Sequence, residues 1–218
     1  MVEASRIEKE INAIQRLIMD MGRRCAEAVS ETMYAFAHLD KEKARQVIDG
    51  DKDIDSDYQE IEKSSFRILL LDHPVARDFR ALGGSLKMIT DLERIGDYCV
   101  DIAEEVLSFP DEPLVPDATK LLAMGNCVSS MVEKALESWE EKDVVLARSL
   151  AKDDDRVDRY FEEIKQDLIE ILRSPNNTYA DQTIVFMMVA KYLERMADHA
   201  VNIGEWVDYS STGSHLMS

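Results

Sequence analysis

Apolar residues recur every three or four positions along nearly the whole sequence, a spacing that places them on one face of an α-helix. The first such run extends from Ile7 to Phe36, and comparable runs follow almost to the end of the chain. Only 8 glycines and 5 prolines occur among the 218 residues, about half of their usual share. The chain therefore has few turns, and the pattern predicts an all-α fold of long helices.

Six helices are predicted, in two groups of three. The first group is Ile7 to Phe36, a second helix capped by Asp40 and stopped by Asp72-His73-Pro74, and a third that starts at Val75. The second group runs from about Asp117 to Trp139, from Asp143 to Arg173 and from Thr178 to Tyr209. The segment 109–116 holds three of the five prolines and marks the boundary. The predicted organisation is two tandem, pseudo-symmetric three-helix bundles over residues 1–109 and 117–209, with a disordered tail at 210–218.

The two halves align with each other. At an offset of 103, Phe36 matches Trp139 and Asp51 matches Asp154, while after the last turn an offset of 101 matches Glu93 with Glu194. A single small shift, placed at a loop, is typical of a duplicated unit. We therefore predict that the two bundles have the same architecture.

Acidic residues interrupt the apolar faces of the helices, although an ionised carboxylate is costly to bury unless it is paired or binds a metal. They are Asp51, Asp55, Glu93 and Asp97 in the first half and Asp154, Asp158, Glu194 and Asp198 in the second. In each half the acids lie at nearly equal distances from the turn between two antiparallel helices. The spacing therefore predicts one cluster of about four carboxylates in each bundle.

Oxygen donors four residues apart on facing helices suit a metal ion that prefers oxygen ligands, such as iron, manganese, magnesium or calcium. Asp101 and Asn202 extend the same faces by one turn and are predicted as further ligands. The alternative is that basic residues neutralise the acids. Arg94 and Arg195 directly follow the two glutamates, and we expect adjacent helical positions to be poorly placed for such pairing.

The duplicated motif resembles that of the PhoU family of phosphate-transport regulators. The first copy reads Asp51-Lys52-Asp53-Ile54-Asp55 and Glu93-Arg94-Ile95-Gly96-Asp97, and the second reads Asp154-Asp155-Arg156-Val157-Asp158 and Glu194-Arg195-Met196-Ala197-Asp198. The resemblance extends from about Ile7 to Trp206. One departure is Asp101, where the family favours the asparagine that the second copy keeps as Asn202.

This resemblance implies two similar three-helix bundles with multinuclear metal clusters, for which iron is expected and manganese, magnesium or zinc are alternatives. It also implies a negative regulator of phosphate uptake and of the phosphate-starvation response. The implied partners are the phosphate-specific ABC transporter and a phosphate-sensing histidine kinase. The protein is expected to be a cytoplasmic homodimer whose contact with the membrane is only peripheral.

A metal-binding adaptor has two alternative functions. A di-metal oxidase of the ferritin-like kind uses Glu-x-x-His motifs, and none of the four histidines, His38, His73, His199 and His215, completes one. The other alternative is a metal-free helical scaffold whose acidic face binds a basic protein. The sequence contains no phosphate-binding glycine-rich motif, and we predict neither catalysis nor a catalytic residue.

The charge balance excludes one further class of function. The 44 acidic residues outnumber the 26 basic ones, for a formal charge of −18. A nucleic-acid-binding surface needs clustered lysine and arginine to neutralise phosphates, so nucleic acid is not an expected partner. No run of 18 apolar residues is present, and no membrane-spanning helix is predicted.

Overall fold

A computed structural model of the chain describes residues 6–72, 74–109, 116–173 and 179–213. The described residues form helices and contain no strand, which confirms the predicted all-α class. The helices are α1 (Arg6–His38), α2 (Lys41–Leu71), α3 (Ala76–Ser108), α4 (Thr119–Glu141), α5 (Val144–Arg148), α6 (Leu150–Arg173) and α7 (Ala180–Thr212).

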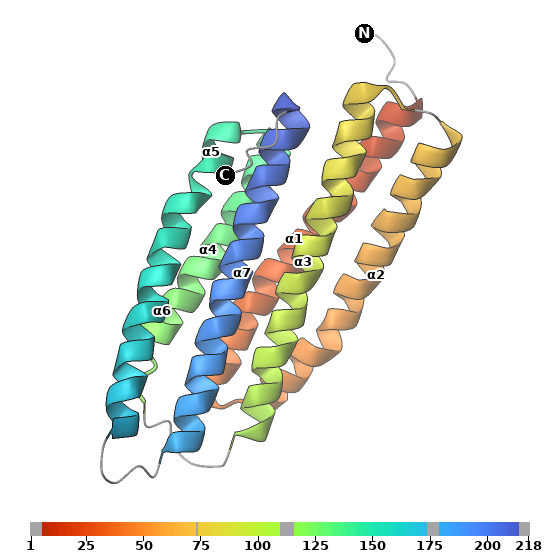
Figure 1. Cartoon of the computed structure of the whole chain (residues 1–218). Coiled ribbons are helices and arrows are strands. Elements are labelled where there is room, and N and C mark those ends of the chain that lie inside the picture. The colour runs from red at the N-terminus through yellow and green to blue at the C-terminus, as the bar shows by residue number, and fades with distance from the viewer. Residues whose placement is uncertain (1–5, 73, 110–115, 174–178, 214–218) are drawn as a thin grey trace.

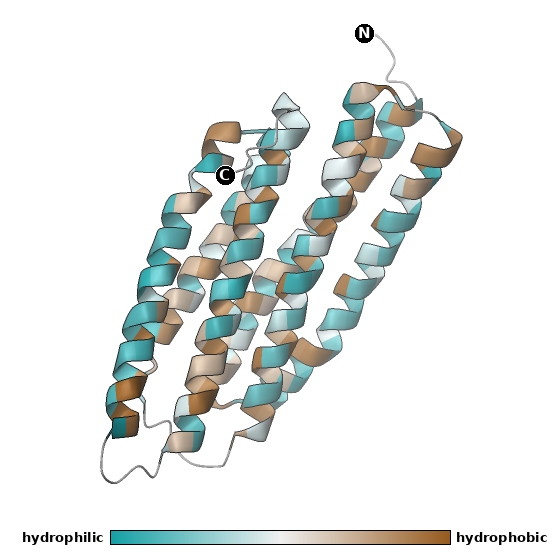
Figure 2. Ribbon diagram, in the orientation of Figure 1, coloured by the Kyte–Doolittle hydropathy of each residue, from teal (hydrophilic) through white to brown (hydrophobic). Residues whose placement is uncertain are grey.

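The helices form two neighbouring bundles, α1–α3 and α4–α7, that lie side by side (Figure 1). The bundles meet where α3 lies against α7 and α1 lies against α4, and the α3–α7 contact is the most extensive in the described fold. Buried apolar residues from both bundles form one continuous core. Hydrophilic and hydrophobic residues alternate along each helix (Figure 2), as amphipathic helices require.

The turn after the first helix of each bundle has the same construction in both repeats. Leu39 and Lys142 end α1 and α4 in the left-handed region, with φ of 50° and 54°. The next residue is an aspartate whose carboxylate accepts two backbone N–H bonds of the following helix, from Glu42 and Lys43 for Asp40, and from the equivalent positions for Asp143. The predicted Asp40 cap is therefore confirmed, and the duplication extends to the turn chemistry.

The second bundle differs from the prediction because its second helix is interrupted. The predicted helix from Asp143 to Arg173 is divided at Ser149 into α5 and α6. The Ser149 hydroxyl donates to the Leu146 carbonyl at 2.6 Å, and its N–H contacts the carbonyls of Val145 and Leu146. This local competition for backbone carbonyls accounts for the break, and α5 with α6 corresponds to the single α2 of the first bundle.

The chain ends of the bundles differ slightly from the predicted boundaries. The helix α7 continues to Thr212 and is closed by Gly213, at φ 76°, whose N–H donates to the Tyr209 carbonyl at 2.8 Å. The tail predicted from residue 210 is therefore wrong for residues 210–212, which are helical. Residues 214–218, the boundary residues 110–115 and the turn at 174–178 lie outside the described residues.

Within the described part of the chain, no helix combines the length and the apolar character needed to cross a membrane.

Close packing between α7 and α5 depends on Gly204. A Cβ at this position would lie 2.8 Å from Leu150 Cδ1 and 3.0 Å from the backbone carbonyl oxygen of Ala147, which cannot move aside easily. We predict that Gly204→Ala lowers the free energy of unfolding by about 1–3 kcal/mol. Chemical denaturation followed by circular dichroism measures this change.

Gly50→Ala is the matched control, because Gly50 is exposed within α2 and a Cβ there would meet no atom within 4 Å. It should raise the free energy of unfolding by about 0.5–1 kcal/mol through helix propensity alone. Equal effects of the two substitutions would contradict the close α5–α7 contact.

Candidate functional site

The first carboxylate cluster lies where α2 packs against α3. Asp51 is partly buried, and its pKa is raised to about 6, first by desolvation and then by the negative charges of Asp55, Asp97 and Glu93. The structure therefore brings together the four acids that the spacing predicted for this bundle. Gly96 permits the approach, since a Cβ on Gly96 would lie 2.9 Å from Asp51 Oδ1.

The second cluster repeats this arrangement between α6 and α7. Desolvation raises the pKa of Asp154 to about 6, and Asp158, Asp198, Asp155 and Glu194 raise it further in that order of effect. The four predicted acids again interact, joined by Asp155 from the next position on α6. The agreement between Asp51 and Asp154 shows that the repeats share electrostatics as well as backbone architecture.

The clusters are open to solvent on one side, and the expectation that all eight acids face the core is wrong for some of them. Five of the eight acids are partly buried, whereas three are exposed, namely Asp55, Asp158 and Asp198. Desolvation shifts the pKa furthest at Asp51 and Asp154, where the pKa reaches about 6.

Cationic side chains neutralise part of each cluster. Arg94 Nη1 lies 2.8 Å from Asp97 Oδ2, and Arg94 Nε lies 3.7 Å from Glu93 Oε2. The expectation that Arg94 is poorly placed for Glu93 is wrong, because its long side chain follows the helix surface. In the second cluster the cation is Lys191, which forms an ion pair with Glu194 three residues later on α7.

The two uncompensated members are Asp51 and Asp154. Every charged neighbour that perturbs the pKa of either residue is an acid. Glu93 and Asp198 differ in this respect. Desolvation raises the pKa of each, but Arg94 and His199 oppose the rise at Glu93, and Lys191 and Arg195 oppose it at Asp198. An added cation would therefore relieve most repulsion beside Asp51 and Asp154.

The described side chains do not already form a metal-coordination shell. Among the residues that the structure describes, no three histidine, cysteine, aspartate or glutamate side chains converge closely enough to hold a metal ion. The donor set nonetheless fits a hard cation, because each cluster offers several carboxylate oxygens on opposing helices. A bound cation would require the carboxylates to rotate toward one another.

Asp101 and Asn202, the further predicted ligands, lie at the contact between the repeats. Desolvation, Glu104 and Asp97 raise the pKa of Asp101, and Asp101 in turn helps to raise the pKa of Tyr192 on α7. The Asn202 amide donates to Asp91 Oδ1 on α3 at 3.1 Å. In this structure Asn202 thus joins the two repeats, and its role as a metal ligand stays a prediction.

The sequence interpretation missed Asp91, a buried acid on α3 that receives three side chains of α7. His199 Nδ1 lies 2.8 Å and Asn202 Nδ2 3.1 Å from Asp91 Oδ1, and Trp206 Nε1 donates to Oδ2 at 3.0 Å. His199 is thus bound to Asp91 on the other repeat, and its positive charge also lowers the pKa of Glu93. Asp91 follows Met88 by three residues and precedes Ile95 by four, on an apolar face that was a usable signal.

The pseudo-symmetric position of Asp91 explains why the duplicated motif did not reveal it. At the offset of 101 it corresponds to Tyr192, and His199 corresponds to Tyr98. The two tyrosine rings stack with centroids 5.8 Å apart. Desolvation raises the pKa of Tyr192, and the negative charges of Asp101 and Glu105 raise it further. Equivalent helix positions therefore meet in both halves of the α3–α7 contact, but with different chemistry.

Comparison with known proteins identifies relatives over nearly the whole chain. The PhoU domain matches twice, at residues 18–106 and 121–207. A phosphate-specific transport system accessory protein PhoU homolog from Clostridium acetobutylicum is 31% identical over 96% of this chain and 95% of its own length. The PhoU homolog 1 of Thermotoga maritima is 30% identical over 99% and 93%.

Solved structures have the same fold. The crystal structure of the phosphate transport system regulatory protein PhoU from Streptococcus pneumoniae matches with a TM-score of 0.90 at 26% identity, over 98% of this chain and all of that chain. PhoU from Pseudomonas aeruginosa matches with a TM-score of 0.90 at 28% identity, over 96% of this chain and all of that one.

The raised pKa of Asp51 predicts a specific dependence of stability on pH. Because the folded pKa, about 6, exceeds the usual value, the ionised group destabilises the metal-free fold increasingly as the pH rises from about 4 through 6. With chelator present, Asp51→Asn should raise the free energy of unfolding by about 1–2 kcal/mol at pH 8 and have little effect at pH 4. Urea denaturation at a series of pH values measures this difference.

The control for this substitution is Asp53→Asn, which makes the same change of charge at an exposed position on the same helix. An Asp51→Asn effect that does not depend on pH, or that matches the control, would contradict desolvation as its cause.

The three contacts of Asp91 predict a large effect of its removal. Asp91→Ala leaves the three donors on α7 without their acceptor in a buried interface, and should lower the free energy of unfolding by about 2–4 kcal/mol. Glu104→Ala, at an exposed position on the same helix, should change it by less than about 0.5 kcal/mol. Thermal and chemical denaturation of both variants provide the measurement, and similar values for the two would refute the role of Asp91 in joining the repeats.

Proposed function

Because this chain belongs to the PhoU family, we propose that it regulates a phosphate-specific transport system and restrains both phosphate uptake and the phosphate-starvation response. The observation that carries the proposal is the double PhoU-domain match. Relatives that align with 96% or more of the chain are named as accessory proteins of phosphate-specific transport. The proposed role is regulation by binding rather than catalysis.

The proposed partners are the phosphate-specific ABC transporter and a phosphate-sensing histidine kinase, with the chain acting as a homodimer at the cytoplasmic face of the membrane. The formal charge of −18 favours basic surfaces on these partners through complementary fields. The two long bundles present two copies of the acidic surface, one on α2–α3 and one on α6–α7, for such contacts.

We further propose that each cluster binds metal, with iron as the expected ion and manganese, magnesium or zinc as alternatives. Asp51, Asp55, Glu93 and Asp97 would hold it in the first bundle, and Asp154, Asp158, Glu194 and Asp198 in the second, with Asp101 and Asn202 as the additional ligands. A bound cation would supply the compensating positive charge that no neighbouring side chain gives to Asp51 and Asp154. The metal is proposed to stabilise the bundles and to shape the surface offered to partners.

A metal-free scaffold is the second candidate function. Two observations favour it, namely the absence of three converging ligands among the described residues and the ion pairs formed by Arg94 and Lys191. In this alternative the uncompensated acids would bind basic side chains of a protein partner directly. Metal content separates the two candidates.

For the metal proposal, protein purified without chelator should contain more than one metal ion per chain by elemental analysis. The double substitution Glu93→Ala with Asp97→Ala should abolish the first site and leave the second, so that metal content falls by about half. Glu60→Ala with Asp53→Ala removes the same charge from exposed positions of α2 and should leave it unchanged. Metal-free protein, even after soaking with iron or manganese, would leave the scaffold as the function.

For the regulatory proposal, deletion of the gene in its own organism should raise phosphate uptake and activate a phosphate-starvation reporter in phosphate-rich medium. Expression of the wild-type chain should restore repression. If the deletion strain behaves like the parent strain, regulation of phosphate transport is not the function. Restoration by the Glu93→Ala, Asp97→Ala variant would show that regulation does not need the first metal site.

A further inference from the structure

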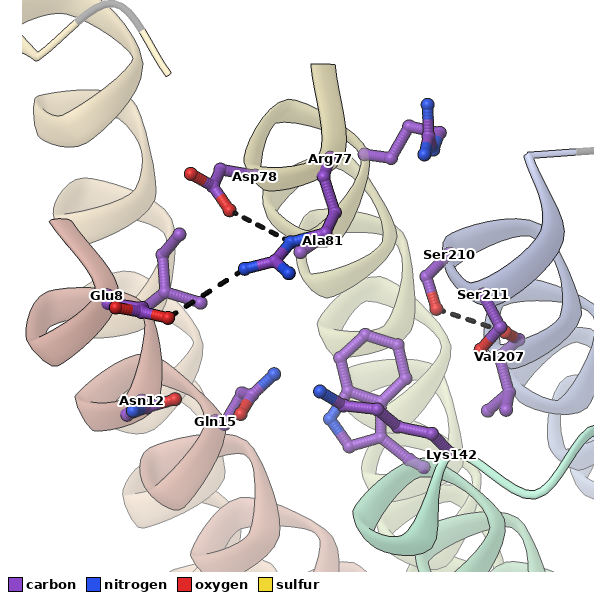
Figure 3. Close-up of a pocket in the computed structure, with 13 residues that line it drawn as sticks. Glu8, Asn12, Gln15, Arg77, Asp78, Ala81, Lys142, Val207, Ser210 and Ser211 are labelled. Atoms are coloured by element: carbon purple, nitrogen blue, oxygen red, sulfur yellow. Dashed lines mark hydrogen bonds and ion pairs between the residues drawn. The ribbon is translucent and has the colours of Figure 1, made fainter. Parts of the chain in front are cut away.

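A cavity of about 590 Å³ lies away from both carboxylate clusters, among the beginnings of α1 and α3 and the ends of α4 and α7. Figure 3 shows Glu8, Asn12 and Gln15 of α1 facing Arg77 of α3, with Ser210 and Ser211 of α7 on the other side. This volume is within the range of sites for small organic molecules. The lining holds three cationic residues, Arg77, Arg80 and Lys142, against two acids, Glu8 and Asp78, whereas acids outnumber bases in the chain as a whole.

Two buried N–H groups at the cavity have no hydrogen-bond acceptor among the described protein atoms. They are Trp139 Nε1 and Arg80 Nε, and both residues line the cavity. Trp139 is only 6% exposed, and its six-membered ring lies against Gly84 of α3. Buried donors are normally satisfied, and these two can be satisfied only by an acceptor, because neither group accepts hydrogen bonds.

The charges at the cavity leave a positive excess. Arg77 contacts both acids of the lining, with Nη2 3.8 Å from Glu8 Oε1 and Nε 3.6 Å from Asp78 Oδ1 (Figure 3). Within the described residues, no carboxylate lies within 4 Å of the guanidinium of Arg80 or the ammonium of Lys142. Arg80 and Lys142 thus place two positive charges on the lining of the cavity, and Arg80 Nε and Trp139 Nε1 are unpaired donors of the same lining. This combination favours a negatively charged occupant.

This chemistry is not imposed by the fold, because the duplicated unit lacks it at the equivalent end. Trp139 and Lys142 correspond to Phe36 and Leu39 at the offset of 103, and Arg80 corresponds to Asp181 at the offset of 101. Phe36 instead packs edge-to-face on Phe186, with ring centroids 5.2 Å apart. At that end Phe186 lines a cavity of about 390 Å³ whose charged lining consists of one lysine, Lys120, and three acids, Asp117, Asp167 and Glu170. The two ends of the protein therefore differ in the sign of the charge around their cavities.

We propose that this cavity binds a small anionic metabolite, whose oxyanion head group accepts hydrogen bonds from Trp139 Nε1 and Arg80 and an ion pair from Lys142. Asn12, Gln15, Ser210 and Ser211 contact its polar body. The head group is a phosphate or a carboxylate, since both present several acceptor oxygens and a negative charge. The site is separate from the carboxylate clusters and does not depend on metal.

Indole NMR tests the proposal directly on the full chain. The protein has two tryptophans, and substitution of Trp206 by Phe assigns their indole N–H signals. The probes are inorganic phosphate, AMP and citrate, which separate a bare phosphate ion, a phosphate on an organic body and a carboxylate. At least one probe should move the Trp139 signal in a saturable way, while the Trp206 signal, whose N–H already donates to Asp91, should stay in place.

Two variants assign the binding to the cavity. Arg80→Gln and, independently, the exposed Lys142→Gln should each weaken binding of the active probe at least tenfold. Arg45→Gln removes the same charge from an exposed position of α2 and should not change it. A Trp139 signal unaffected by all three probes at 10 mM, or affinity equal to wild type in the Lys142→Gln variant, would overturn the proposal. Neither result would bear on metal binding by the clusters.

Discussion

The contact between α3 and α7 is the interaction on which the arrangement of the two bundles depends. Each of these helices belongs to one repeat, carries half of a carboxylate cluster on one face and packs against the other repeat on another. Asp91 of α3 fixes this contact by accepting bonds from His199, Asn202 and Trp206. His199 directly follows Asp198 in the sequence, and Asn202 lies one helical turn after it. The same segment of α7 therefore sets both the register between the repeats and the geometry of the second cluster.

The carboxylate clusters show how the protein tolerates repulsion that a helical bundle would normally avoid. Arg94 and Lys191 lie on the same helices as the glutamates and neutralise one side of each cluster. Asp51 and Asp154 remain without a compensating cation, and desolvation together with the neighbouring acids raises the pKa of each to about 6. The cost is limited because the other acids reach solvent at the rim. Apolar residues at these positions would avoid this repulsion, and the repulsion that remains is the physical basis of the proposal that the clusters bind a cation or a basic partner.

Much of the fold follows from the sequence because helix periodicity and the duplication impose independent constraints. The apolar spacing indicates the helices, and the matching of Asp51 with Asp154 and Glu93 with Glu194 indicates two similar bundles with acids at corresponding heights. The break at Ser149 was not predicted, because a single hydroxyl competing for a carbonyl leaves the apolar period unchanged. The pairing of Arg94 was also missed, since helical spacing describes where a side chain begins and not how far its flexible end extends.

Asp91 exposes a limit of reasoning from the duplication itself. Its counterpart Tyr192 has different chemistry, so a search for repeated acids passes over it even though both residues occupy the same interface. The same is true of Trp139 and Lys142, which replace Phe36 and Leu39 at the end of the opposite bundle. A residue that is identical in both repeats satisfies a requirement of the shared architecture. Where the two repeats differ although their surroundings are equivalent, as at Trp139 and Phe36, the duplication gives no signal, and the buried donors of Trp139 and Arg80 are recognised only in the folded structure.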